Sequence, residues 1–204
     1  ERREVRMKTI TYFSGARAGN RPEYEDAAKR IGDFIGRQKC FVKYGGSRTG
    51  LMGAFCFSLK DAAAQSGSGT KIFGILPKKY ATVNKPETLG IEFVVTETLA
   101  ERKHLLLEKA DAFLVMPGGI GTLDEIFETI ETDYLPADRD PTIGEYTIRP
   151  IFVLNLHGFY DSIRDQLQLM HDEGFLVGQK TANLFFYETV DAYLAALERF
   201  FQNA

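Results

Sequence analysis

Short runs rich in β-branched and aromatic residues alternate with longer stretches of helical periodicity, and this alternation constrains the fold more than any other feature. Such a pattern is typical of βαβ units, in which parallel strands are covered by helices on both faces. The sequence therefore predicts an α/β fold with a Rossmann-like, doubly wound, mainly parallel sheet. The predicted strands are Thr9–Phe13, Phe41–Tyr44, Lys71–Leu76, Phe93–Thr96, Ala112–Met116, Pro150–Asn155 and Leu184–Tyr187, and the predicted helices are Pro22–Arg37, Gly50–Gln65, Leu99–Lys109, Leu123–Tyr134, Tyr160–Glu173 and Val190–Phe201.

Two connections between these elements, Pro77–Ile91 and Leu135–Arg149, are longer than the usual links of such a fold. Both are candidates to cover a binding site. No internal repeat, low-complexity tract or shift in composition marks a domain boundary. A chain of 204 residues with 44% hydrophobic content can bury one sizeable core, so a single domain over residues 1–204 is predicted.

The charge balance and the two cysteines limit the partners and the compartment. Lysine and arginine number 25 against 28 acidic residues, and a net charge of −3 gives no electrostatic argument for nucleic acid or an anionic membrane. Cys40 and Cys56 stand in apolar surroundings, which favours buried thiols in a reducing compartment. No apolar run approaches the ~20 residues of a membrane span, and no apolar run follows the charged N-terminal stretch. We therefore expect a cytoplasmic protein that binds neither nucleic acid nor membrane.

Three predicted strand ends carry glycines: Phe13–Gly19 (FSGARAG), Tyr44–Gly53 (YGGSRTGLMG) and Pro117–Glu125 (PGGIGTLDE). In a doubly wound sheet, ligands bind at the carboxyl ends of the strands, where the N-termini of helices attract anions. Any one of these segments could be a tight turn, because glycine is the default residue where φ must be positive. Three of them together indicate a ligand that carries phosphate.

Two common nucleotide motifs do not fit. The first turn reads SGARAG rather than G-x-G-x-x-G, and the second strand ends without the acidic residue of a dinucleotide site. The segment from Gly45 to Gly50 has the glycine spacing of a P-loop, but Leu51 and Met52 stand where lysine and a hydroxyl residue are required.

The segment Thr98–Lys103 (TLAERK) opens a predicted helix. Thr98 and Glu101 have the spacing of a capping box, in which each side chain accepts a backbone N–H at the helix start. Arg102 and Lys103 oppose the helix macrodipole there. An anionic ligand or a nearby carboxylate would explain them, and a solvated surface pair is the alternative.

Thr122 and Glu125 have the same capping-box spacing. The preceding glycines would also bring backbone N–H groups to a ligand, with Glu125 within a side-chain length of it. A helix cap and a catalytic carboxylate are therefore competing roles for Glu125.

The remaining polar residues give weaker signals. His104, His157 and His171 are scattered without the spacing of metal ligands, so no metal site is predicted. Arg17 and Arg48 each lie inside a glycine-bearing segment, where contact with phosphate or base and a plain surface position are equally well supported.

At these motifs the sequence resembles the Lonely Guy (LOG) phosphoribohydrolases, a family also labelled lysine decarboxylase-like. PGGIGTLDE fits the family motif PGGxGTxxE, and the Arg-Lys of ERK fits its companion motif. FSGARAG, YGGSRTGLMG, ADAFLVMPGGIGT and GFYD (Gly158–Asp161) extend the resemblance over nearly the whole chain. Nothing in the sequence suggests the pyridoxal-phosphate site of a decarboxylase.

The resemblance implies hydrolysis of the N-glycosidic bond of a nucleoside 5′-monophosphate, releasing free base and ribose 5-phosphate. It implies a nucleotide-binding domain that uses no cofactor and forms a homodimer in which neighbouring subunits complete the site. The implied catalytic residues are Glu125 and Arg102. The implied substrate-binding residues are Ser14, Gly15, Gly46, Arg102, Lys103, Gly118, Gly119, Gly121 and Thr122.

The sequence departs from the family on either side of these motifs. Leu99 and Ala100 stand where members commonly carry Met-His, and no Trp-x-Gln-Leu-Gly stretch follows the helix after PGGIGTLDE. The accepted base is therefore open between cytokinin nucleotides and plain monophosphates such as AMP. A non-catalytic nucleotide or molybdenum-cofactor binding protein on the same fold is the alternative, and a nucleotide sensor with Leu135–Arg149 as its output is a third. The paired acid and arginine favour an enzyme.

Overall fold

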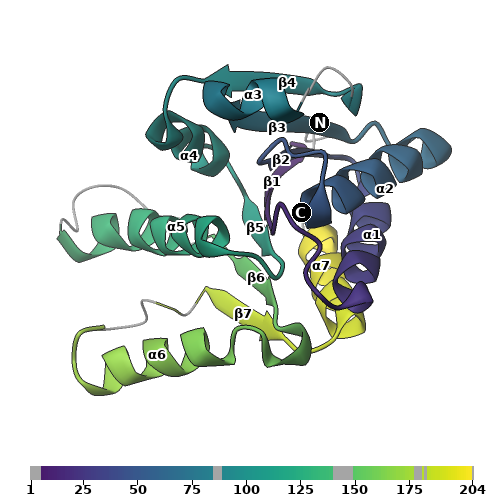
Figure 1. The fold of residues 1–204 in the computed structure, drawn as a ribbon. Helices are drawn as coiled ribbons and strands as arrows, with labels where there is room; N and C mark the ends of the chain where they lie inside the picture. Colours follow the sequence, from purple (N-terminus) through teal and green to yellow (C-terminus); the bar gives the residue numbers. More distant parts are fainter. Residues whose placement is uncertain (1–5, 85–88, 140–148, 177–180, 182, 204) are drawn as a thin grey trace, which may run out of the picture.

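A single sheet of seven strands forms the centre of the protein, in the order β4-β3-β2-β1-β5-β6-β7 (Figure 1). The computed structural model describes residues 6–84, 89–139, 149–176, 181 and 183–203. Every pair of neighbouring strands is parallel, so the prediction of a mainly parallel sheet is confirmed. The strands are β1 (Lys8–Phe13), β2 (Cys40–Tyr44), β3 (Lys71–Pro77), β4 (Glu92–Thr96), β5 (Ala112–Val115), β6 (Ile151–Leu154) and β7 (Leu184–Tyr187).

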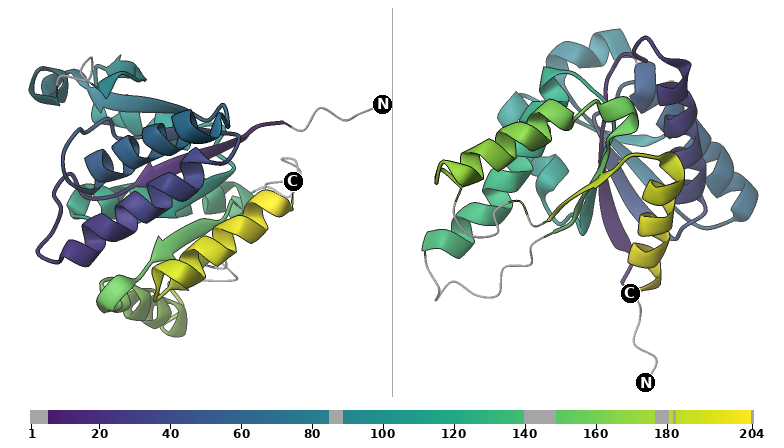
Figure 2. Two further views of the ribbon diagram at one scale, coloured as in Figure 1. Left: turned by 90° about the vertical axis from the view of Figure 1, so that its right-hand side faces the viewer. Right: turned by 90° about the horizontal axis from the view of Figure 1, so that it is seen from below.

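Helices cover both faces of the sheet, as Figures 1 and 2 show. One layer consists of α1 (Pro22–Gly36), α2 (Gly50–Ser66) and α7 (Val190–Gln202), and the other of α4 (Leu99–Leu107), α5 (Ile120–Arg139) and α6 (Asp161–Asp172). A short helix, α3 (Lys78–Asn84), follows β3.

The core is divided by the sheet into two buried clusters, and the side chains of the central strands alternate between them. Ile10 and Tyr12 of β1 pack in the cluster with α1, α2 and α7, whereas Phe13 packs in the cluster with α4 and α5. β5 alternates in the same way, with Leu114 in the first cluster and Val115 in the second. Burial on both sides explains why the strands read as nearly continuous apolar runs.

The order of the strands reverses direction at β1. The chain builds outward through β2, β3 and β4 on one side and then continues at β5 on the other. β1 and β5 are neighbours, with Phe13 beside Val115, so the segments that follow them diverge from adjacent points. Such a switch point leaves a crevice at the carboxyl ends of the strands, where ligands bind in open α/β sheets.

The predicted bounds of α5 are wrong at both ends. Helix α5 begins at Ile120 rather than Leu123 and continues to Arg139 rather than ending at Tyr134. The Gly119 carbonyl accepts the N–H groups of Thr122 and Leu123, which extends the helix back through the glycine-rich segment. Helix α3 occupies part of the connection predicted over Pro77–Ile91. Residues 140–148 of the second predicted connection lie outside the described residues.

Both cysteines are buried free thiols, as predicted. Burial raises the pKa of Cys40 to about 12, which keeps the thiol protonated and unreactive. Among the helices that the structure describes, none is long and apolar enough to cross a membrane.

Candidate active site

The three glycine-bearing strand ends meet at the switch point and are joined by backbone hydrogen bonds. The Gly15 N–H donates to the Pro117 carbonyl at 3.1 Å, which joins the segments after β1 and β5. The N–H groups of Leu51 and Met52, in the first turn of α2, donate to the Gly15 carbonyl at 3.1 and 3.4 Å. Gly15 therefore holds the other two segments together.

The glycines after β5 have two different surroundings. A Cβ on Gly118 would stand 2.1 Å from Thr122 Oγ1 and 2.9 Å from Gly15 N, so only glycine fits there. A Cβ on Gly119 or Gly121 would meet nothing within 4 Å, and neither residue has positive φ. Neither backbone conformation nor packing therefore requires glycine at these two residues, and both of them line a cavity.

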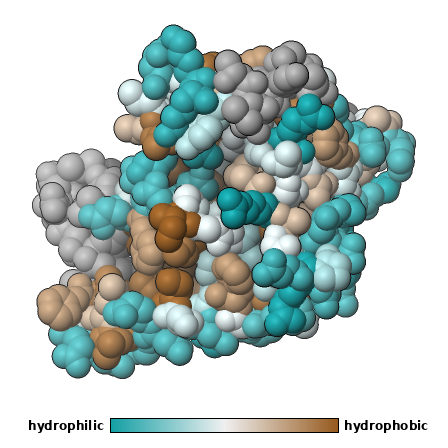
Figure 3. Space-filling view, viewed as in Figure 1, coloured by the Kyte–Doolittle hydropathy of each residue, from teal (hydrophilic) through white to brown (hydrophobic). Residues whose placement is uncertain are grey.

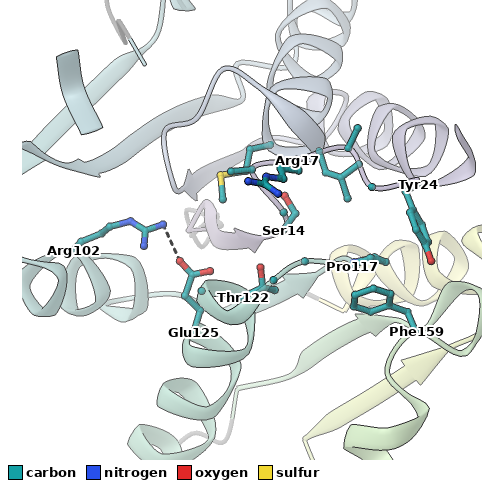
Figure 4. A pocket seen from close by; sticks show the side chains of 17 residues that line it. Ser14, Arg17, Tyr24, Arg102, Pro117, Thr122, Glu125 and Phe159 are labelled. Carbon is teal, nitrogen blue, oxygen red and sulfur yellow. Dashed lines mark ion pairs between the residues drawn. The ribbon is translucent and has the colours of Figure 1, made fainter. Parts of the chain in front are cut away.

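A cavity of about 460 Å³ opens where the three segments meet (Figure 4). Its size falls within the usual range of small-molecule sites. Predicted site residues make up nearly half of its lining, and the structure brings eight of them together. They are Ser14, Gly15, Arg102, Gly118, Gly119, Gly121, Thr122 and Glu125.

Arg102 and Glu125 form an ion pair at one end of this cavity, with 2.9 Å between Arg102 Nη2 and Glu125 Oε1 (Figure 4). The side chain of Glu125 is 3% exposed and that of Arg102 is 14% exposed. Arg102 Nε also donates to the Ile75 carbonyl at 3.2 Å, which gives the guanidinium a second anchor. The carboxylate thus explains a cation at the start of α4 that local helix electrostatics disfavour.

Burial raises the pKa of Glu125 to about 7, and the charge and hydrogen bond of Arg102 act in the opposite direction. A carboxyl group in this range exchanges its proton near neutral pH, which is the property required of a general acid or base.

The capping-box interpretation of Glu125 is wrong. Thr122 lies inside α5 rather than before it, because the helix begins at Ile120, and the Glu125 carboxylate faces Arg102. The corresponding prediction for α4 is confirmed, since Thr98 Oγ1 accepts the Glu101 N–H at 3.1 Å. Two identical spacings therefore have different outcomes, which depend on where each helix begins.

Two of the predicted substrate-binding residues lie outside the cavity lining. Gly46 has φ +74° and packs against Leu76 of β3, so the backbone turn requires glycine at this residue. Lys103 forms ion pairs with Asp124 at 3.2 Å and Glu128 at 3.0 Å, which tie α4 to α5.

Ser14 contributes an unsatisfied polar group to the cavity. The residue is 1% exposed, and its hydroxyl has no hydrogen-bond partner among the described residues. An unpaired buried hydroxyl costs about 1–3 kcal/mol. A ligand in the cavity that accepts a hydrogen bond would recover this energy.

Aromatic side chains that the sequence motifs did not single out line the opposite end of the cavity. Tyr24 of α1 and Phe159 contact each other edge to face, with ring centroids 6.0 Å apart. The turn that carries Phe159 is fixed by Tyr160, whose N–H donates to Asn155 Oδ1 at 2.6 Å and whose hydroxyl donates to the Met116 carbonyl at 2.8 Å. Phe159 belongs to the GFYD segment, which was the only sequence signal for this wall.

The two arginines of the glycine-bearing segments lie at different sites. Arg17 lines the cavity, whereas Arg48 faces a different surface groove between α1 and α2. Within the described part of the chain, no three histidine, cysteine or acidic side chains are grouped as a metal site would need.

The doubly wound sheet, with a cavity at its switch point between glycine-rich loops, defines a Rossmann-like α/β protein. The family model described as "Possible lysine decarboxylase" matches residues 58–197. The LOG2 cytokinin riboside 5′-monophosphate phosphoribohydrolase of Arabidopsis thaliana is 33% identical over 177 residues, which cover 86% of this chain and 76% of that protein. The chain therefore belongs to the LOG phosphoribohydrolase family.

Two further proteins extend this comparison. A cytokinin riboside 5′-monophosphate phosphoribohydrolase of Rhodococcoides fascians is 30% identical over 191 residues, which cover 93% of this chain and 89% of that protein. A molybdenum cofactor carrier protein from Chlamydomonas reinhardtii has the same fold, with a TM-score of 0.64 and 17% identity over 95% of this chain and 98% of the carrier. The second likeness concerns the fold alone.

The decarboxylase description has no counterpart in the cavity. Pyridoxal-phosphate enzymes bind their cofactor through a lysine Schiff base. The residues that line the cavity, all of them in the described part of the chain, include no lysine.

Proposed function

We propose that this protein hydrolyses the N-glycosidic bond of a nucleoside 5′-monophosphate to free base and ribose 5-phosphate. The observation that carries the proposal is the buried Glu125–Arg102 pair, which lies near the starts of α5 and α4 and lines the cavity. A paired acid and arginine on the wall of a cavity of about 460 Å³ supply the charges that this reaction needs. The names of the relatives support the same reaction class.

The 5′-phosphate binds at the N-terminus of α5. The first N–H groups of a helix have no partners within the helix, and its positive dipole end attracts anions. The space beside Gly119 and Gly121 lets the phosphate approach the backbone. The hydroxyls of Ser14 and Thr122 line the same part of the cavity and donate to phosphate oxygens.

Glu125 acts on the sugar. As the bond between C1′ and the base breaks, the bonding electrons leave with the base and positive charge develops on the ribose ring. The Glu125 carboxylate stabilises that charge and accepts a proton from the water that attacks C1′. The departing base takes up a proton from solvent and Glu125 returns its own to solvent, so that the reaction consumes one water. Arg102 holds the carboxylate in place and stabilises the negative charge that develops on the departing side.

The substrate class that we propose is a cytokinin riboside 5′-monophosphate or an AMP-like nucleotide. The relatives are named for the first of these. A carrier that binds a nucleotide or molybdenum cofactor without turnover is the rival on the same fold. It has only the likeness in fold in its favour.

We also propose a cytoplasmic homodimer. Figure 3 shows apolar side chains gathered over α5 and α6. The exposed large apolar residues of these helices and of the segment that follows α6 include Ile120, Phe127, Leu169 and Phe175. Exposed apolar patches of this kind mark interaction sites, and self-association through such a patch is the common arrangement of oligomers. In light scattering, the wild type is expected to have the mass of two chains and Leu169→Asp that of one. A monomeric wild type would refute the dimer.

The experiment that tests the reaction incubates the protein with a panel of nucleoside 5′-monophosphates, including AMP and a cytokinin riboside monophosphate, and with the corresponding nucleosides. Chromatography detects the free base. We expect base from at least one monophosphate and much less from the matching nucleoside. Tight binding of a monophosphate with no base released from any would favour the carrier.

A further inference from the structure

Three charged side chains line the cavity: Arg17, Arg102 and Glu125. Arg102 and Glu125 are 2.9 Å apart and neutralise each other. Arg17 forms no ion pair within the part of the chain that the structure describes. It is therefore the unpaired charge of the cavity wall, and its positive sign suits an anion.

The phosphate site proposed above lacks a full positive charge. A phosphate monoester carries about −1.5 to −2 at pH 7, whereas a helix N-terminus is equivalent to roughly +0.5. The hydroxyls of Ser14 and Thr122 are neutral. Lys103, which the resemblance assigned to substrate binding, is held by Asp124 and Glu128 with its side chain 18% exposed. A further cation is needed to balance a bound phosphate.

We propose that Arg17 is the phosphate-binding residue that makes this site select nucleoside 5′-monophosphates over nucleosides, an inference that rests on the proposed function. Figure 4 shows Arg17 beside Ser14, on the wall of the cavity opposite Thr122 and Glu125. A phosphate between these walls contacts the guanidinium on one side and the N-terminus of α5 on the other. The forked donors of a guanidinium match two phosphate oxygens at once.

The backbone that carries Arg17 is held in place. A Cβ on Gly50 would stand 2.5 Å from Arg17 N, so the start of α2 packs directly against this loop. Thr49 Oγ1 donates to the neighbouring Ala16 carbonyl at 3.2 Å. The exposed side chain of Arg17 thus extends from a fixed backbone, which lowers the entropic cost of binding.

Arg48 provides a matched control. It also lies in a glycine-bearing segment after a strand, but it faces a groove of about 600 Å³ whose other charged residues are Glu25, Lys29, Asp33 and Asp61. Its three acids outnumber its one lysine, so the groove around Arg48 offers no net positive charge for phosphate. Removing Arg48 therefore changes the charge of the protein by the same amount without touching the proposed phosphate site.

The test compares the wild type with Arg17→Ala, Arg17→Lys and Arg48→Ala. The steady-state kinetics of AMP, or of the best monophosphate of the panel, give KM and kcat, and calorimetry gives the affinities for inorganic phosphate and for adenosine. We expect Arg17→Ala to raise KM and to weaken phosphate binding, each roughly 10- to 100-fold. We expect kcat and adenosine binding to change little, Arg17→Lys to recover part of the loss, and Arg48→Ala to match the wild type.

Unchanged KM and phosphate affinity in Arg17→Ala would overturn the inference. So would an equal loss of phosphate and adenosine binding, because that would indicate a collapsed loop rather than a lost phosphate contact. If the wild type releases no base from any nucleotide but binds phosphate in a way that depends on Arg17, the proposed reaction fails and the role of Arg17 stands.

Discussion

Helices α2 and α5 both begin at glycine-rich strand ends on the switch-point side of the sheet, yet the two starts serve different purposes. At α2, the N–H groups of Leu51 and Met52 already donate to the Gly15 carbonyl. A Cβ on Gly50 would stand 2.4 Å from the carbonyl carbon of Ala16, and Gly50 has φ +61°. The glycine at the start of α2 is therefore needed for packing and for backbone conformation.

The start of α5 differs in each of these respects. Gly119 and Gly121 have neither positive φ nor a neighbour that would contact a Cβ, and both line the cavity. Glu125 follows within the next turn, buried against Arg102, whereas the first turn of α2 holds no acidic residue. Glycine thus allows close backbone packing at the start of α2, whereas at the start of α5 it leaves space for a ligand.

Among the substitutions that test this contrast, Glu125→Gln is expected to have the largest effect on catalysis. If α5 carries the chemistry, removing the carboxylate should lower kcat for the best nucleoside monophosphate about 10²- to 10⁴-fold. Asp61→Asn, on the exposed surface of α2, is the control and should retain wild-type kcat. Rates of base release measured by chromatography decide the question, and a wild-type rate in Glu125→Gln would remove Glu125 from the mechanism.

Gly50→Ala tests the other side of the comparison. The new Cβ overlaps the backbone of Ala16 at a residue with positive φ, so the free energy of unfolding should fall by about 2–4 kcal/mol. Gly67→Ala separates the two causes, because Gly67 has φ +64° but nothing within 4 Å of a Cβ, and it should lose only about 1 kcal/mol. Urea unfolding measures both. Equal losses would show that overlap at Gly50 contributes nothing.

The sequence predicts the central strands well because they are buried on both faces. Runs such as Ala112–Val115 are apolar throughout and lie between turn residues, so the predicted strands match the observed ones within one or two residues. The start of α5 was misplaced for a physical reason. Glycine, a weak helix former, and a Thr-x-x-Glu spacing both suggested that the helix begins after Gly121, whereas the Gly119 carbonyl extends it backward.

The site was predictable in its residue types but not in its geometry. A cation at the start of α4 indicates a nearby anion, but the sequence left a ligand, a carboxylate and a surface position open, and only the fold brings Arg102 to Glu125. Gly46 and Gly118 look alike in sequence, and Gly46 proves to pack against Leu76. Tyr24 reaches the cavity from α1 without any local motif.

The buried Glu125 near the start of α5 also predicts that the stability of the protein depends on pH. The first turn of α2 holds no acidic residue that could have the same effect. Glu125 binds its proton more tightly in the folded protein, with a pKa of about 7 against the usual 4.5. Its contribution to stability is therefore present below pH 4.5 and is lost as pH rises to 7, by up to about 3 kcal/mol. Urea unfolding at pH 5 and pH 8 should show this loss in the wild type and not in Glu125→Gln.

Activity should change with pH in the opposite direction from stability. The ionised carboxylate is the form that stabilises positive charge and accepts a proton, so kcat/KM should rise as pH increases through about 7. An identical dependence of unfolding on pH in the wild type and Glu125→Gln would contradict the assignment of this pKa.

The smallest change in stability, and the most direct comparison with Gly50, is expected from Gly121→Ala. Alanine favours a helix over glycine by up to ~1 kcal/mol, and a Cβ at this residue meets nothing within 4 Å, so the free energy of unfolding should stay level or rise slightly. The methyl group would nevertheless occupy the space through which phosphate approaches the N-terminus of α5. Calorimetry should therefore show roughly 10-fold weaker binding of inorganic phosphate, with the variant fully folded. Wild-type phosphate affinity in a stable Gly121→Ala would mean that the open space at α5 is not where the anion binds, and the contrast between the two helix starts would then concern packing alone.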